Sequence, residues 1–274
     1  MNNLINACTD LLCEVREKSP LIHNITNYVT VNDCANAILA IGASPIMADD
    51  AKEVEEIVSI SSALVINIGT LNQRTITSMI MAGKRANELN IPVILDPVGA
   101  GASILRNKTI QEILSQVKIN VICGNLSEVS FLAGLKVSTK GVDTAKVDEK
   151  NDAVVIAKLV ANKYSCVVGI TGKVDIISDG IRVAKIANGH KLLSRVTGTG
   201  CMTSALIGSF CSVTNDYYMA TVIGIATMGI SGEIAFEKTG IIGTGSFHIS
   251  IIDALSNMNS TCFLERAKID ETKN

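Results

Sequence analysis

Short apolar runs that alternate with longer amphipathic stretches constrain the fold of this chain more than any other feature. Four runs have the length and the branched apolar residues of buried β-strands, at residues 63–67, 92–95, 120–122 and 166–170. Helical patterns lie between them, for example at residues 73–89 and 152–163. The repeated order of strand, helix and strand predicts an α/β fold, with a mostly parallel central sheet flanked by helices on both faces.

Polar and glycine-rich turns directly follow the predicted strands. They occupy residues 67–70, 96–101, 124–125 and 171–172. Because ligands of parallel sheets bind at the carboxyl ends of the strands, these turns predict one composite site.

The second half of the chain departs from this alternation. Residues 174–178 and 181–187, joined by Asp179 and Gly180, are typical of an antiparallel hairpin. From Cys201 onward the pattern predicts helices, followed by a polar tail over residues 267–274. The sequence contains no internal repeat, low-complexity linker or break in composition, so we predict a single domain over residues 1–274.

The charges of the 274-residue chain are nearly balanced, with 24 Lys and Arg against 26 Asp and Glu. No block of five or more like charges occurs, which argues against nucleic acid or an anionic membrane as a partner and favours small molecules. The eight cysteines form no C-x-x-C pair, so we interpret them as reduced thiols. The acidic N-terminal segment is unlike a signal peptide, and we expect a cytoplasmic protein.

The most apolar segment runs from Met219 to Phe236. It contains three glycines, Ser231 and Glu233, and it is short for a membrane span of about 20 residues. We therefore predict a buried helix.

A glycine-rich turn, TGTGC at residues 197–201, opens a predicted apolar helix. Glycine allows positive φ and close approach of the backbone, so the amides from Gly198 to Cys201 can converge on a phosphate. Alternatively, the glycines serve only tight helix packing, since neither a Walker A motif nor a complete G-x-G-x-x-G is present. The anion-hole interpretation gives catalytic roles to Gly198, Gly200 and Cys201.

Two carboxylates follow predicted strands. Asp96 comes directly after the run that ends at Leu95, and Glu128 lies in the first turn of a later helix. Mg²⁺ takes a few oxygen ligands and keeps several waters, so Asp96 and Glu128 are the predicted metal ligands. The alternative roles are structural: Asp96 caps a turn, and Glu128 complements a helix dipole.

Cys201 also lies at the start of the predicted helix, where the dipole is expected to stabilise a thiolate and lower the pKa of the thiol. The alternative role is that of a small packing residue. His23, His190 and His248 are not spaced as metal ligands, and we expect each to be a surface or hydrogen-bonded residue.

Six short motifs occur in order over roughly residues 3–265: HNITN (23–27), GASPIMA (42–48), NIGTL (67–71), LDPVGAGA (95–102), ITGKVD (170–175) and VTGTGC (196–201). Together they resemble the hydroxyethylthiazole kinase family of the ribokinase-like superfamily. The resemblance implies ATP-dependent, Mg²⁺-assisted phosphorylation of the alcohol of 5-(2-hydroxyethyl)-4-methylthiazole, a salvage step of thiamine biosynthesis.

The same resemblance implies roles for individual residues. The thiazole pocket is lined by Asn27, Met47 and Gly198, with Met47 against the ring. The nucleotide is expected to meet Cys123, Asn125 and Thr171, and magnesium is expected at Asp96 and Glu128. Family members are typically trimers with sites at subunit boundaries, so the resemblance also implies a homotrimer.

One position departs from the family pattern. Cys123 stands just before Gly-Asn, where the family usually has an arginine that reaches an ATP phosphate. A neutral thiol does not supply that charge. Either the backbone at this position suffices, or another cation, Arg106 or Lys173, takes the place of the arginine.

Two other functions stay open at this stage. One is a ribokinase-like kinase for another heterocyclic alcohol, of the pyridoxal or hydroxymethylpyrimidine type. The other is a non-catalytic regulator that binds a ligand on the same fold. Many related sugar kinases have aspartate where Cys201 stands, which suggests that Cys201 is a modest proton acceptor or only shapes the anion hole.

Overall fold

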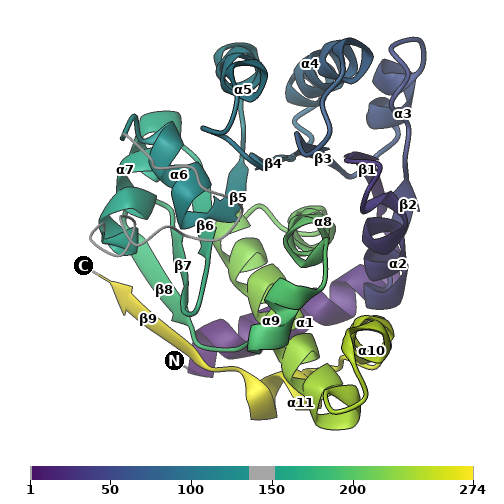
Figure 1. The fold of residues 1–274 in the computed structure, drawn as a ribbon, viewed down its shortest axis with the longest axis vertical. Coiled ribbons are helices and arrows are strands. Elements are labelled where there is room, and N and C mark those ends of the chain that lie inside the picture. Colours follow the sequence, from purple (N-terminus) through teal and green to yellow (C-terminus); the bar gives the residue numbers. More distant parts are fainter. Residues whose placement is uncertain (1, 136–151, 274) are drawn as a thin grey trace.

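Six parallel strands form the main part of the central sheet in the computed structural model, which describes residues 2–135 and 152–273 (Figure 1). In sheet order they are β2 (Ser44–Ile46), β1 (Leu21–Ile25), β3 (Ala63–Asn67), β4 (Val93–Asp96), β5 (Val121–Asn125) and β6 (Val167–Thr171). β3 and β4 are buried along their whole length, because helices cover both faces of the sheet. The four strands predicted from the sequence are confirmed.

Three antiparallel strands extend the sheet beyond β6. β7 (Asp175–Ser178) and β8 (Arg182–Ile186) form the predicted hairpin, and β9 (Ile269–Lys273) pairs with β8. The sequence predicted only a polar tail where β9 lies. The ladder hydrogen bonds to β8 order this segment, although it is too polar to show a strand pattern. Asn274, the last residue of the predicted tail, lies outside the described residues.

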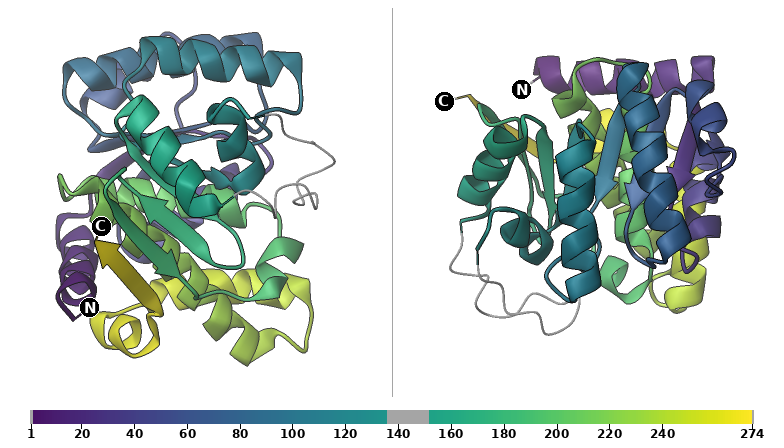
Figure 2. Two further views of the ribbon diagram at one scale, coloured as in Figure 1. Left: turned by 90° about the vertical axis from the view of Figure 1, so that its left-hand side faces the viewer. Right: turned by 90° about the horizontal axis from the view of Figure 1, so that it is seen from above.

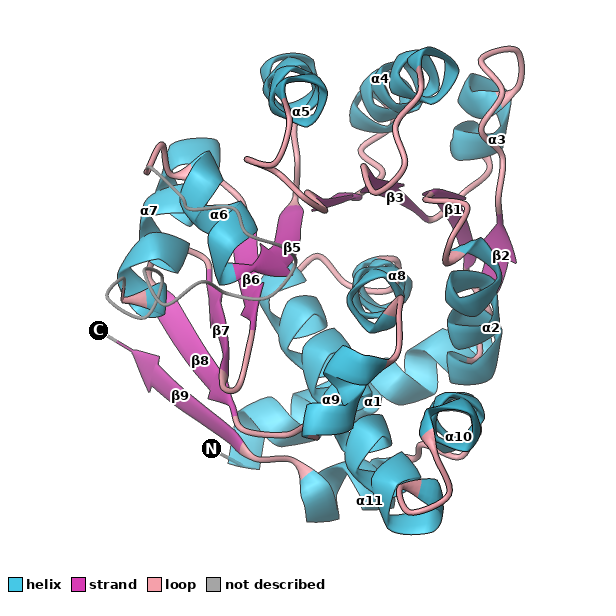
Figure 3. Ribbon diagram, in the orientation of Figure 1, coloured by secondary structure: helices cyan, strands magenta, loops and turns pink. Residues whose placement is uncertain are grey.

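Helices cover both faces of the sheet, as Figure 3 shows. One face carries α3 (Val54–Ser59), α4 (Gln73–Glu88), α5 (Ile104–Gln116), α6 (Leu126–Leu132) and α7 (Ala153–Tyr164). The other face carries α1 (Asn2–Lys18), α2 (Val31–Ile41), α8 (Thr199–Cys211), α9 (Tyr217–Thr239), α10 (Thr244–Ser256) and α11 (Ser260–Arg266). Each face buries its own hydrophobic cluster, so the predicted α/β architecture is confirmed.

The helices of each layer lie close to the strands that they cover. Figure 2 shows α4 and α5, in blue and blue-green, side by side over one face of the sheet. On the opposite face α8 lies directly over β3 and β4. A Cβ at Gly208 would lie 2.5 Å from Cγ2 of Val65, so glycine is required for this close approach. The packing brings the first turn of α8 to the carboxyl ends of these strands.

The long apolar helix α9 meets the length and composition criteria for a membrane span. However, 78% of its most apolar 18-residue window is buried inside the protein, against α8, α10 and the sheet. The prediction of a buried helix is confirmed.

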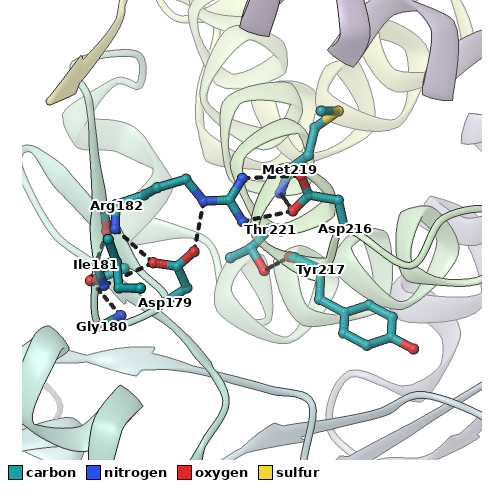
Figure 4. Close-up of polar contacts among 9 residues, drawn as sticks. Asp179, Gly180, Ile181, Arg182, Asp216, Tyr217, Met219 and Thr221 are labelled. Carbon is teal, nitrogen blue, oxygen red and sulfur yellow. Dashed lines mark hydrogen bonds and ion pairs between the residues drawn. The ribbon is translucent and has the colours of Figure 1, made fainter. Parts of the chain in front are cut away.

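An ion-pair cluster joins the start of α9 to the β7–β8 turn (Figure 4). Because β7 runs antiparallel to β6, this turn lies beside the amino end of β6, away from the carboxyl ends of the parallel strands. Arg182 binds both carboxylate oxygens of Asp216, at 3.0 and 3.1 Å, and Nε of Arg182 donates to Asp179 at 2.6 Å. The guanidinium also lies 4.1 Å from the centre of the Tyr218 ring. These contacts join the β7–β8 turn to the helix that fills the core beneath it.

Candidate functional site

The carboxyl ends of three adjacent strands hold a continuous row of buried polar side chains. Asn27 follows β1, Asn67 ends β3 and Asp96 ends β4, directly beside Asn67 in the strand register. Nδ2 of Asn27 donates to Oδ1 of Asn67 at 3.1 Å, and Nδ2 of Asn67 donates to Oδ2 of Asp96 at 2.7 Å. These bonds fix the orientation of both amides and of the carboxyl group.

Helix α8 completes this polar network from the other side. The Ser204 hydroxyl donates to Oδ2 of Asp96 at 3.0 Å. Sγ of Cys201 accepts hydrogen bonds from Nδ2 of Asn27 and from Nδ2 of Asn67, both at 3.3 Å. Cys201 and Ser204 are three residues apart, so they lie on one face of the helix and meet the same strand ends.

The first turn of α8 has the backbone conformation expected of an anion hole. Gly198 is the N-cap, with a φ of 88°, and no side chain caps the helix in the described part of the chain. A Cβ at Gly198 would lie 2.7 Å from Cγ2 of Thr30, whereas a Cβ at Gly200 would lie more than 4 Å from every described atom outside the adjoining part of its own helix. Among the described residues, the amides of this turn thus have no side-chain cap, and the space beside Gly200 is open.

Asp96 and Glu128 are buried carboxyl groups that influence each other. Burial, followed by the charge of Glu128, raises the pKa of Asp96 to about 8. Burial also raises the pKa of Glu128. Two neighbouring carboxylates that are this poorly solvated would be stabilised by a divalent cation.

The donor set fits magnesium better than a metal held by protein alone. Within the described residues, no three His, Cys, Asp or Glu side chains converge as metal ligands. Magnesium commonly uses one or two carboxylates and completes its shell with water and substrate phosphates, so Asp96 and Glu128 are sufficient.

Glu128 also has the structural role that was the alternative to metal binding. It accepts a hydrogen bond from the Gly99 amide at 2.8 Å and one from the Asn125 amide at 2.9 Å. Asn125 in turn caps α6 by accepting from the Glu128 amide at 2.9 Å, which completes a capping box. These contacts hold the Glu128 carboxylate beside the β4–α5 loop.

The remaining predicted residues continue the row along the sheet edge. Met47 follows β2 at one end, and Thr171 closes β6 at the other, where its hydroxyl lies 3.4 Å from the Gly124 carbonyl oxygen. Across the sheet the order is Met47, Asn27, Asn67, Asp96, Asn125 and Thr171. The predicted thiazole residues thus lie on one side of Asp96 and the predicted nucleotide residues on the other.

The prediction of a low thiol pKa for Cys201 is wrong. Burial, followed by the nearby charge of Asp96, raises the pKa of this thiol to about 11. The position at the helix start was apparent from the sequence, but the burial and the neighbouring carboxylate arise only from the tertiary structure. Cys201 is therefore a neutral thiol near pH 7.

We expect Cys201→Ala to lose less than about tenfold in kcat, because the α8 amides survive the substitution and a loose phosphoryl transfer does not require a strong base. A thiolate acting as general base would instead give a loss on the order of a hundredfold or more. The measurement is kcat from pH 6 to 9 for both proteins. A wild-type kcat that rises tenfold per pH unit, as the thiol with its pKa of about 11 ionises, would contradict this expectation.

Cys123 is only 2% exposed, in β5, and its side chain belongs to the core on the α8 face. Of the two cations considered as substitutes for the family arginine, Arg106 already binds three backbone carbonyl groups. Lys173 is exposed beside Thr171 and forms no ion pair among the residues that the structure describes. The exposed position of Lys173 near Thr171 makes this lysine the better candidate to replace the family arginine.

The histidines have the hydrogen-bonded roles predicted for them. His23 is buried and bonds the Ala48 carbonyl oxygen at 2.7 Å, and His248 pairs with Asp33 at 3.0 Å. His190 caps the 3-10 helix η2 (Lys191–Arg195).

Sequence reasoning assigned no individual role to Asn67 or Ser204, and it considered Arg106 only as a substitute for the family arginine. Asn67 was visible as a polar residue at a strand end, and Ser204 as a hydroxyl one turn beyond the glycine motif. The contacts of Arg106 with three backbone carbonyl groups had no signal in the sequence.

Comparison with known proteins agrees with this geometry. The model of the "Hydroxyethylthiazole kinase family" matches residues 12–261. The chain is 62% identical to a hydroxyethylthiazole kinase of Ruminiclostridium cellulolyticum, over 99% of this chain and 100% of that protein. It is also 62% identical to a hydroxyethylthiazole kinase of Clostridium beijerinckii, over 95% of this chain and 96% of that protein. This chain belongs to the hydroxyethylthiazole kinase family.

Solved structures extend the family assignment to the fold. A hydroxyethylthiazole kinase of Pyrococcus horikoshii is 41% identical and superposes with a TM-score of 0.89, over 98% of this chain and 100% of that one. The pyridoxal kinase of Staphylococcus aureus, solved with AMP-PCP and pyridoxal, is 14% identical, with a TM-score of 0.61 over 93% and 99% of the chains. The family thus shares the ribokinase-like fold with a more distant kinase.

Proposed function

We propose that this protein phosphorylates the alcohol of 5-(2-hydroxyethyl)-4-methylthiazole with ATP, in the salvage branch of thiamine biosynthesis. The observation that carries the proposal is the order of side chains along the strand ends, from Met47 through Asp96 to Thr171. An alcohol bound on the β1–β2 side and a nucleotide bound on the β5–β6 side would meet above Asp96 and the first turn of α8. Phosphoryl transfer requires this meeting.

The thiazole side of the site is assigned to Asn27, Met47 and the backbone at Gly198. Both ends of the Asn27 side-chain amide are already bonded. Its Nδ2 donates to Oδ1 of Asn67 at 3.1 Å, and its Oδ1 accepts from the Thr30 backbone amide at 3.1 Å. Asn27 thus shapes the pocket floor as a fixed amide, while the half-buried Met47 offers a polarizable surface to the ring.

The nucleotide side is assigned to the turns after β5 and β6. Asn125 and Thr171 are paired across these strands, and Lys173 is exposed in the loop after Thr171. The Lys173 ammonium supplies the cationic contact to phosphate that Cys123, buried in β5, does not. The amides from Gly198 to Cys201 stabilise the transferring phosphoryl group.

Asp96 and Glu128 are assigned to magnesium. When bound, the ion would neutralise charge on the phosphates of ATP. The two residues are held in place without it, Asp96 by Asn67 and Ser204 and Glu128 by two backbone amides. A prearranged pair of carboxylates reduces the reorganisation required at the time of reaction.

The homotrimer and the cytoplasmic location are further parts of the proposal. The two residues after Asn27 are apolar and exposed, with 78% exposure at Tyr28 and 54% at Val29. A neighbouring subunit that covers them would also close the thiazole side of the pocket. Light scattering of the purified protein tests the trimer.

The test of the proposed reaction is an assay with ATP, Mg²⁺ and a panel of hydroxyethylthiazole, hydroxymethylpyrimidine and pyridoxal. We expect hydroxyethylthiazole to give the highest kcat/KM. A higher value for either other alcohol would assign the protein to a different ribokinase-like substrate. An absence of turnover with all three, together with ligand binding, would favour a regulator.

A further inference from the structure

We propose that Arg106 is a positioning residue that sets the orientation of both site carboxylates through two peptide groups. Arg106 lies in the first turn of α5, on the opposite face of the sheet from α8. Nη1 of its guanidinium donates to the carbonyl oxygens of Ile68 and Val98, each at 2.6 Å. Nη2 donates to the Gly69 carbonyl oxygen at 2.6 Å.

Each carbonyl bound by Nη1 belongs to a peptide whose amide holds a site residue. The Ile68–Gly69 peptide accepts from Arg106 at its oxygen, and its N–H donates to Oδ1 of Asn67 at 2.8 Å. The Val98–Gly99 peptide accepts from the same nitrogen, and its N–H donates to Oε1 of Glu128 at 2.8 Å. One guanidinium nitrogen thus fixes two peptide planes.

The first of these peptides acts on Asp96 and Cys201 through Asn67. With its Oδ1 held by the Gly69 amide, Asn67 directs Nδ2 toward Oδ2 of Asp96 at 2.7 Å and toward Sγ of Cys201 at 3.3 Å. The second peptide acts directly on Glu128. A charge-assisted bond to a carbonyl also polarises the peptide, which strengthens the bond that its N–H makes.

The local backbone is shaped to admit the guanidinium. Gly99 has a φ of 71°, and a Cβ there would lie 3.2 Å from Nε of Arg106. A residue other than glycine would be strained in this conformation and would press against the arginine. The planar fork reaches three carbonyls in two loops, and a lysine ammonium on its shorter stem does not reproduce that geometry.

This inference rests on the proposed roles of Asp96 and Glu128. We expect Arg106→Ala and Arg106→Lys each to lower kcat by about 10- to 100-fold, the usual range for groups that orient catalytic ligands. The KM values for ATP and the thiazole should change less than about threefold, because the Arg106 guanidinium is already bonded to three backbone carbonyl oxygens and is not assigned to either substrate. Guanidinium ion added to Arg106→Ala should restore part of kcat, whereas methylammonium at the same ionic strength should not.

The matched control is Arg74→Ala, which removes an exposed arginine paired with Asp49 and should leave kcat unchanged. A double-mutant cycle with Asp96→Asn tests whether Arg106 acts through the carboxylate, and the two losses should then be less than additive. If Arg106→Ala is too unstable to purify, the Arg106→Lys variant carries the same measurements.

Other outcomes overturn the inference in recognisable ways. An ATP KM raised tenfold or more with kcat intact would make Arg106 a phosphate-binding residue. A lower melting temperature with normal kcat would show that Arg106 has only a structural role. Wild-type turnover in Asp96→Asn would refute the proposed carboxylate roles themselves, whereas an inactive Asp96→Asn beside a fully active Arg106→Ala would refute only the positioning role.

Discussion

We expect Asp96→Asn to lower kcat by on the order of a hundredfold or more, while the protein keeps its fold. A magnesium ion held by Asp96 and Glu128 would supply several kcal/mol of charge stabilisation to phosphoryl transfer, and each 1.4 kcal/mol corresponds to about tenfold in rate. Among the described residues, both hydrogen bonds to the Asp96 side chain, from Asn67 and from Ser204, end on Oδ2. The amide oxygen of an asparagine can accept the same two bonds.

The substitution also removes a costly buried acid, whose pKa is raised to about 8 by burial and by Glu128. The melting temperature should therefore stay equal or rise, because a poorly solvated carboxyl group lowers the stability of the folded protein and is retained for activity. The measurements are kcat at saturating ATP and Mg²⁺, the KM for the thiazole, and the melting temperature in EDTA. The thiazole KM should change little, because the proposed thiazole pocket is assigned to Asn27, Met47 and Gly198 and not to Asp96.

The matched control is Asp216→Asn, the same chemical change at the opposite edge of the sheet. Asp216 caps α9 and pairs with Arg182, far from the strand carboxyl ends. We expect this variant to lose stability and to keep its kcat at 25 °C. Unchanged turnover in Asp96→Asn would remove Asp96 from the site.

Much of the fold could be predicted because its signals are local. The buried parallel strands are continuous apolar runs, and the β7–β8 turn has the glycine that its φ of 95° at Gly180 requires. β9 was not predicted, because this edge strand is ordered by its hydrogen bonds to β8 and not by an apolar pattern of its own. Its sequence, IDETK, has one apolar residue, and only pairing with β8 makes it a strand.

In the candidate site, the residues that could be proposed from the sequence are those whose residue type and local position suggest a role. The glycines of TGTGC and the carboxylates at strand ends are of this kind. Ser204 and Arg106 are not, since their partners lie 108 residues away at Asp96 and 37 residues away at Gly69. The high thiol pKa of Cys201 was hidden for the same reason, because burial and a distant carboxylate cause it.

We expect Gly198→Val to lower kcat/KM by on the order of a hundredfold or more. The residue has a φ of 88°, which a β-branched side chain rarely adopts, and its Cβ would lie 2.7 Å from Cγ2 of Thr30. If the backbone shifts to relieve the unfavourable φ or the clash with Thr30, the N-cap of α8 moves, and the amides of the first turn and Cys201 move with it. A displacement of about 1 Å in a site of this kind can cost about a hundredfold.

The steric part of this effect can be separated from the backbone part. Thr30→Ser removes Cγ2 and keeps the hydroxyl, so Gly198→Ala should be more active with Thr30→Ser than alone. If the double variant is still less active than the wild type, the remaining loss of activity measures the backbone strain caused by the positive φ at residue 198. A folded Gly198→Val protein with wild-type kcat/KM would refute the anion-hole interpretation.

Gly200→Ala tests the same turn without strain, and its two expected effects have opposite signs. Gly200 is within the first turn of α8, and a Cβ there would lie more than 4 Å from every described atom outside the adjoining part of this helix. Alanine is favoured over glycine in a helix by about 1 kcal/mol, so the melting temperature should rise. If the phosphoryl group approaches the amides of this turn, the new methyl group occupies its space, and kcat should fall although the protein is more stable. A Gly200→Ala variant that is both more stable and fully active would place the phosphate elsewhere.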